Sequence, residues 1–136
     1  MKICVTVVIQ VVFVGSFLGW AYYLKRSSPN RDDAKLEEIK TEIVKLPLHP
    51  SFQKIGEDYS SRHMDAGGTL YYRSNANGES VRAFYATELP KLGWQIDRET
   101  NPPFFHKNDL RLRIEYRPDQ SDWNYALDVE WKNPNN

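Results

Sequence analysis

The sequence predicts an α+β fold: an N-terminal transmembrane helix and a short connector helix, then a mainly antiparallel sheet with one packed α-helix. Three observations support this. An uncharged run fills most of residues 1–26, apolar and polar residues alternate in several segments after residue 47, and one segment between them repeats its apolar residues at helical spacing. Alternation indicates half-buried strands and spacings of three and four indicate an amphipathic helix. The expected order in the domain is strand-strand-helix-strand-strand-strand-strand.

The first element is the uncharged run Ile3–Leu24. As a helix rising about 1.5 Å per residue it is roughly 33 Å long, enough to cross a hydrocarbon core of about 30 Å. Trp20, Tyr22 and Tyr23 lie at its far end, where aromatic rings favour the membrane interface. A cleaved signal peptide has a shorter apolar region of about 7–15 residues. The sequence therefore favours a retained anchor over residues 1–26, with a cleaved signal peptide as the alternative.

Two glycines in this run raise the question of self-association. Gly15 and Gly19 have the Gly-x-x-x-Gly spacing that allows membrane helices to approach closely. The same spacing arises readily by chance, so a homodimer through the span is an alternative and not the main prediction.

The second element is a connector over residues 27–46. Turn-forming residues at 27–30 end the membrane helix, and Leu36, Ile39, Ile43 and Leu46 then follow at spacings of three, four and three. These spacings predict an amphipathic helix over residues 32–45 that Pro47 ends. A stalk helix that docks on the domain is favoured over a coiled coil, because two heptads are few for a coiled coil.

The domain is expected to span residues 47–132, followed by a disordered tail at 133–136. Strands are predicted at 52–59, 69–74, 94–99, 104–107, 110–116 and 125–131, with turns at Gly67-Gly68, 75–78 and Asn108-Asp109. The helix carries its apolar residues from Val81 to Leu92. Gly93 is placed to end it in a left-handed conformation, and Pro90 should distort its last turn.

Charged residues alternate with the apolar ones on the last two strands. Arg111 and Arg113 share one strand face, and Asp128 and Glu130 share one on the other strand. If these strands pair, the opposite charges face each other, worth roughly 0.2–1 kcal/mol per pair. An arginine stripe that binds an anionic ligand is the alternative.

Composition excludes several classes of function. Eighteen Lys and Arg balance eighteen Asp and Glu, so the positive excess of a nucleic-acid-binding protein is missing. The one cysteine, Cys4, lies in the apolar run, so the domain has neither a disulfide nor a thiolate metal site. No phosphate loop, nucleophile elbow or dinucleotide fingerprint occurs, and no cofactor or metal is expected.

An enzyme site remains an alternative near one loop. His63 and Asp65 are two residues apart, and Asp58 lies near them in sequence. A metal would need a third, distant ligand. General acid–base chemistry would need a cleft that raises one pKa. The sequence shows neither feature, so a solvated loop is the preferred interpretation.

Aromatic residues exceed what one small core obviously hides. Neighbouring strand residues point to opposite faces, so one member of each pair Tyr71-Tyr72 and Phe104-Phe105 should face away from the helix. With Trp123 these residues form either a patch for a partner or a surface covered by the connector helix and loops.

The segment from Ser80 to Ile96, SVRAFYATELPKLGWQI, resembles a pattern in small exported or membrane-anchored bacterial domains of unknown function. Phe84-Tyr85 and Gly93-Trp94 match the Phe-Tyr…Leu…Gly-Trp pattern. The resemblance implies an α+β sheet with one helix, an extracytoplasmic address and no activity. The positive-inside rule points instead to the cytoplasmic side, because Lys2 stands on one side of the run and Lys25, Arg26, Arg31 and Lys35 stand on the other.

These observations predict a single-span membrane protein that presents a small non-catalytic binding or accessory domain, with its domain on the extracytoplasmic side. Its partners are expected to be the membrane and another membrane or envelope protein. A membrane-anchored enzyme and a purely structural, self-associating protein are the alternatives.

Overall fold

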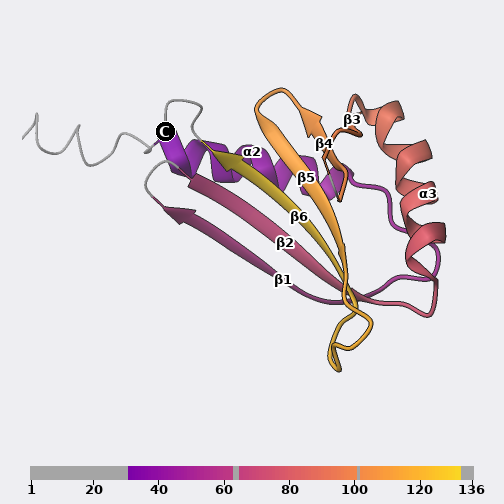
Figure 1. Cartoon of the computed structure of the whole chain (residues 1–136). Coiled ribbons are helices and arrows are strands. Elements are labelled where there is room, and N and C mark those ends of the chain that lie inside the picture. Colours follow the sequence, from indigo (N-terminus) through magenta and orange to yellow (C-terminus); the bar gives the residue numbers. More distant parts are fainter. Residues whose placement is uncertain (1–30, 63–64, 101, 133–136) are drawn as a thin grey trace, which may run out of the picture. The chain divides into compact units, whose positions relative to one another are not determined.

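The computed structural model describes residues 31–62, 65–100 and 102–132, which belong to one structural unit. A six-stranded antiparallel sheet with strand order β1-β2-β6-β5-β4-β3 runs through this unit, and two helices pack on it (Figure 1). Its elements are α2 (Arg31–Lys45), β1 (Gln53–Arg62), β2 (Asp65–Arg73), α3 (Gly78–Glu88), the 3₁₀ helix η1 (Leu89–Leu92), β3 (Gln95–Asp97), β4 (Phe104–Lys107), β5 (Leu110–Tyr116) and β6 (Tyr125–Lys132). The order and type of elements predicted for residues 31–132 are confirmed.

The sheet carries its core on one face. On β2 and β6 the residues at alternate positions are buried, as are Leu110 and Leu112 at the start of β5. Their neighbours along each strand are half-buried or exposed on the other face, except for the buried Ala126. Tyr72, Tyr125 and Tyr116 face each other across these three strands at one end of the sheet. Ala66, Trp131 and Leu110 do the same at the other end, where α2 covers them.

The connector helix α2 is part of this core. Ile39 is fully buried and Ile43 is 6% exposed, while Val44 on the opposite side of the helix is 85% exposed. Near its start, Asp33 accepts a hydrogen bond from Ser61 of β1 at 3.0 Å. The prediction of a helix that docks on the domain is confirmed, because the sheet supplies the apolar surface that α2 covers.

One turn prediction is wrong. Gly67-Gly68 was expected to form a turn, but both residues lie inside β2, which pairs with β1 as far as Asp65 with Arg62. The physical reason is helix packing. A Cβ at Gly68 would lie 2.7 Å from Ile43 Cδ1 and 2.8 Å from the Tyr59 ring, so α2 and Tyr59 occupy the space that a side chain would need. Gly68 therefore permits close helix-to-sheet packing.

The second helix begins and ends as its sequence indicates. The Asn77 side chain accepts a hydrogen bond from the Ser80 backbone N–H at 2.7 Å, an N-cap. Pro90 lies in η1, and Gly93 follows with φ 85°. The predicted distorted last turn and left-handed glycine are confirmed. Asn108 adopts φ 54° in the predicted hairpin between β4 and β5.

Two ion pairs connect α2 with the β4–β5 hairpin. The Lys107 ammonium lies 2.7 Å from a Glu42 carboxylate oxygen, and Lys35 lies 2.7 Å from Asp109. Burial raises the pKa of both carboxyl groups. The hydrogen bonds and charges of Lys107 and Lys45 outweigh it at Glu42, as those of Lys35 do at Asp109. The pKa of each acid therefore lies below its ordinary value.

We expect these acids to make the stability of the domain pH-dependent. Folding lowers the pKa values of both acids, so both contribute to the free energy of unfolding above their ordinary pKa values of 4.5 and 3.8. This contribution is lost as the pH falls through the lowered pKa values. The free energy of unfolding, measured by denaturant titration from about pH 6 to about pH 2, should fall more in the native protein than in a Glu42→Gln, Asp109→Asn double variant. Glu37→Gln is the control, because within the described part of the chain Glu37 forms its ion pair with Lys40 of the same helix and no ion pair with the hairpin. Equal pH dependence in the native protein and the double variant would contradict the expectation.

The predicted span lies outside the described residues, as do Gly15 and Gly19. Within residues 31–62, 65–100 and 102–132, no helix has the length and apolar character that crossing a membrane requires.

Candidate functional site

A groove lies between α3 and the second half of β5. It consists of two hollows of about 460 Å³ and 270 Å³ that share Arg82, Pro102 and Ile114. Since both hollows touch the same three residues, we treat them as one site, which we call the α3–β5 groove.

The groove exists because β4 is shorter than β5. All seven residues of β5 pair with β6, but within the described residues only Leu110, Arg111 and Leu112 pair with β4. Pro102 and Pro103 precede β4 at the positions where a longer strand would continue. Proline has no backbone N–H to donate to a ladder. The sheet therefore opens beside Ile114 and Tyr116.

One face of α3 forms a wall of the groove. Glu79, Arg82, Ala83 and Ala86 line the smaller hollow, and their spacings of three, one and three place them on one side of a helix. This side differs from the core side, which carries the buried residues Val81, Tyr85 and Leu89. The small alanine side chains leave room between the helix and the sheet.

The smaller hollow is mainly apolar. Besides α3, its lining includes Ile96, Phe105 and Ile114 from three neighbouring strands, together with the two prolines. Phe105 is 4% exposed, so it belongs to the core and only a small part of its surface is open to the groove. Burying an apolar side chain of a ligand here would contribute a favourable free energy of about 25 cal/mol per Å² of apolar surface removed from water.

The larger hollow is more basic. Arg82, Arg113 and Arg117 line it, together with one acid, Glu115. Arg117 pairs with Glu115 at 3.2 Å, and Arg113 pairs with acids of β6. Arg82 donates a hydrogen bond from Nε to the Gly78 carbonyl at 3.1 Å and has no acidic partner among the described residues. This arrangement leaves one arginine charge available where the two hollows meet.

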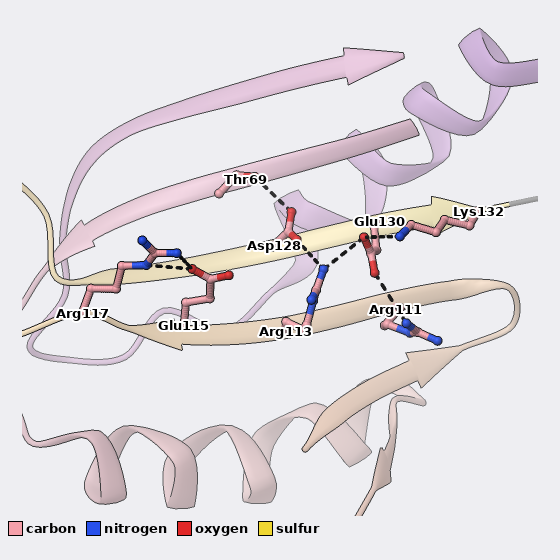
Figure 2. A network of polar contacts seen from close by, with 8 residues as sticks. All are labelled: Thr69, Arg111, Arg113, Glu115, Arg117, Asp128, Glu130 and Lys132. Carbon is pink, nitrogen blue, oxygen red and sulfur yellow. Dashed lines mark hydrogen bonds and ion pairs between the residues drawn. The ribbon is translucent and has the colours of Figure 1, made fainter. Parts of the chain in front are cut away.

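The other face of the sheet carries a network of ion pairs (Figure 2). Arg113 lies between Asp128 and Glu130, at 3.6 Å and 3.2 Å, and Arg111 lies 3.7 Å from Glu130. Thr69 on β2 donates a hydrogen bond to Asp128 at 3.0 Å. The predicted pairing of opposite charges across β5 and β6 is confirmed. Since these arginines already have carboxylate partners, the structure favours pairing over the anion-binding stripe.

Partial burial changes the acid–base properties of this network. Burial raises the pKa of Asp128 above its ordinary value, and the neighbouring Glu130 charge adds to the increase, while the Thr69 hydrogen bond and Arg113 lower it in part. On the core side, burial also raises the pKa of the Tyr85 hydroxyl. Both shifts follow from burial in packed surroundings and do not by themselves indicate catalysis.

The predicted aromatic patch divides between the two faces of the sheet. Tyr72 and Phe105 are 6% and 4% exposed and belong to the core. Tyr71, Phe104 and Trp123 are half-buried. Tyr71 packs on Trp123 with ring centroids 5.1 Å apart, and the Arg111 guanidinium lies 4.2 Å from the Phe104 ring centroid.

The aromatics of the open face are not contiguous. Tyr71 and Phe104 lie on β2 and β4, with β6 and β5 between them, so about 14 Å of sheet separates them. The ion-pair network fills this interval. Of these aromatic residues, Tyr71 and Trp123 line a hollow of about 250 Å³. The structure thus offers two small aromatic surfaces in place of one patch.

The proposed enzyme site is only partly described. His63 lies outside the described residues. Asp58 and Asp65 are both exposed, on β1 and β2. In the part of the chain that the structure covers, no three His, Cys, Asp or Glu side chains are grouped to hold a metal ion.

Sequence reasoning missed the α3–β5 groove. The signal was present, because two prolines precede a strand of four residues that pairs with a strand of seven. Strand length alone does not reveal such a gap. It becomes visible only when the register between β4 and β5 is known.

A comparison with protein families gives one match. The model of a family described as START domain-like matches residues 53–122, from the first residue of β1 to the loop before β6, about half of the chain. Searches of curated proteins and of solved structures found no match. The match fits the predicted small α+β domain, whereas the Phe-Tyr…Leu…Gly-Trp signature and the membrane anchoring stay predictions. This chain belongs to the START domain-like family.

Proposed function

We propose that this protein is a membrane-tethered, non-catalytic binding module that holds its ligand in the α3–β5 groove. The observation that carries the proposal is the open groove itself, apolar at one end and with the Arg82 charge at the junction of its two hollows. Ligand sites are typically concave, mostly apolar and equipped with a few polar groups. Membership of the START domain-like family agrees with a small binding domain.

Site-specific photocrosslinking tests the binding function. A photoreactive amino acid at Ala86 would place the crosslinker in the groove of the full-length protein in its native membrane. Ser80 is the matched control, because it is an exposed residue of α3 that does not line the groove. An adduct of defined mass from position 86 and none from position 80 is the expected result. No adduct at position 86, or the same adduct at both positions, would count against the groove.

The tether rests on the uncharged run over residues 3–24. We expect the full chain to stay in the membrane fraction after an alkaline carbonate wash and a chain that begins at residue 27 to be released.

A reporter active on only one side of the membrane, fused after Asn136, would determine the topology. The proposal expects activity outside the cytoplasm, and activity inside would support the positive-inside count.

A further inference from the structure

The proposed function does not specify the class of ligand. The backbone groups at the edge of β5 indicate which class the groove can bind. Along β5, Leu110 and Leu112 pair with Lys107 and Phe105 of β4 through the backbone. Arg117, three residues beyond Ile114, directs its backbone N–H to Asn124 on the β6 side. Backbone groups of a strand alternate between its two sides. The backbone N–H and C=O groups of Ile114 and Tyr116 therefore point away from β6 and toward the groove.

These groups lie beyond the end of the ladder. The last described pair between β4 and β5 is Phe105 with Leu112. Continuing that register would bring Pro103 opposite Ile114, but no such pair exists among the described residues, and a proline has no backbone N–H to donate there. Ile114 and Tyr116 are two residues apart, which is about 6.8 Å along a strand. An extended peptide of three to five residues has the matching repeat of donors and acceptors.

We propose that the α3–β5 groove binds an extended peptide segment of a partner protein, which adds as a short strand to the edge of β5 at Ile114 and Tyr116. This inference rests on the proposed function. An apolar side chain of the peptide enters the hollow beside Ala83, Ala86 and Phe105, and a carboxylate of the peptide pairs with Arg82. The peptide is thus a β-forming segment with an apolar residue and an acidic residue.

The other edges of the sheet fit this role less well. β1 is an outer edge, but it carries exposed charges along its length, among them Lys54, Glu57 and Asp58, and its pairing with β2 is irregular between Lys54 and Gly56. Charges and bulges are the usual protection of an edge strand. β3 has only three residues. Only the β5 edge combines free ladder positions with an adjoining apolar hollow, within the described residues.

Charge complementarity selects an acidic peptide. Arg82, Arg113 and Arg117 line the larger hollow against one acid, and the Arg82 charge has no acidic partner among the described residues. Arginine forms strong, directional hydrogen bonds with carboxylates. A neutral or basic peptide would leave this interaction unmade.

Peptide selection tests the inference. A displayed library of random nine-residue peptides would be panned against the full-length protein in detergent micelles, and the enriched peptides would be synthesised. We expect them to alternate apolar residues with polar ones and to contain an acid. Binding of such a peptide should slow hydrogen exchange of the Ile114 and Tyr116 amides. Methylating every second backbone nitrogen of the peptide, in the register that faces β5, should abolish its binding.

Two charge reversals complete the test. Arg82→Glu should weaken the affinity of the selected peptide by about tenfold or more. Arg62→Glu should leave it unchanged, because Arg62 ends β1 at the opposite edge of the sheet. Failure to enrich any peptide, protection of β1 amides in place of Ile114 and Tyr116, or equal effects of both reversals would overturn the inference.

The failure of this inference can be told apart from failure of the proposed function. If the crosslinker at Ala86 captures a molecule of defined mass but no peptide protects the β5 edge, the groove binds a ligand of another class and only the inference falls. If the crosslinker captures nothing and no peptide is selected, both the proposed function and the peptide inference are contradicted.

Discussion

Replacing Trp131 with Ala is expected to lower the free energy of unfolding by about 3–5 kcal/mol, the range for removal of a large buried aromatic side chain. Trp131 is fully buried between Ala66 and Leu110 on the core face of the sheet. Two cations of α2 lie over its ring, the Arg31 guanidinium at 5.5 Å and the Lys35 ammonium at 5.9 Å from the centroid. The variant would leave a cavity under α2 and remove both contacts.

Denaturant unfolding of the native protein and two variants measures this effect. Trp131→Phe is the control, because it keeps an aromatic ring in the same place. The Trp131 indole N–H lies near enough to the Asp109 carboxylate to help lower the pKa of that group, but it makes no hydrogen bond of ordinary geometry among the described residues. Phe therefore removes at most a weak polar contact and should cost much less than Ala. A loss below about 1 kcal/mol for the Ala variant would show that α2 does not depend on this ring.

Gly68→Ala is expected to destabilise the domain by about 1–3 kcal/mol, the usual cost of overpacking a core. The added Cβ would lie 2.7 Å from Ile43 Cδ1 and 2.8 Å from two Tyr59 ring carbons, closer than such atoms approach each other. The end of the Ile43 side chain can rotate away. The Tyr59 ring is larger and lies between β1 and α2, so it must shift together with the helix.

The neighbouring glycine provides the control. A Cβ at Gly67 would meet only the Val129 carbonyl oxygen, at an ordinary contact distance of 3.6 Å. Gly67→Ala should therefore be neutral or stabilise the domain by up to about 1 kcal/mol, because it reduces the freedom of the unfolded chain. Both values come from the same denaturant titrations. Equal stability of the two variants would show that α2 does not pack closely on Gly68.

The periodic segments were predictable because their signal is local. Alternation along β5 and β6 placed Arg111 and Arg113 opposite Asp128 and Glu130, and the structure shows these pairs. The apolar spacing in residues 31–45 predicted α2, and Gly93 marked the end of the second helical segment. In each case a few neighbouring residues carry the information that decides the conformation.

The aromatic residues show where local signals stop. Tyr71-Tyr72 and Phe104-Phe105 had to divide between two faces, but the sequence did not say which member of each pair was buried. The register with β6 and β5 decided it, since Tyr72 and Phe105 share their face with Leu127 and Leu112. The position of Trp123 beside Tyr71 likewise depends on a loop that returns to β2.

By itself, the sequence determined the order of helices and strands, the inner and outer faces of β5 and β6, the hairpin turn at Asn108-Asp109 and the left-handed conformation of Gly93. Only the tertiary structure decided that two adjacent glycines lie in a strand under α2 and that β4 ends early enough to open a groove beside Ile114. The reason is physical. Periodicity and turn preference depend on residues close in the chain, whereas close packing and the end of a ladder depend on surfaces that meet only after folding.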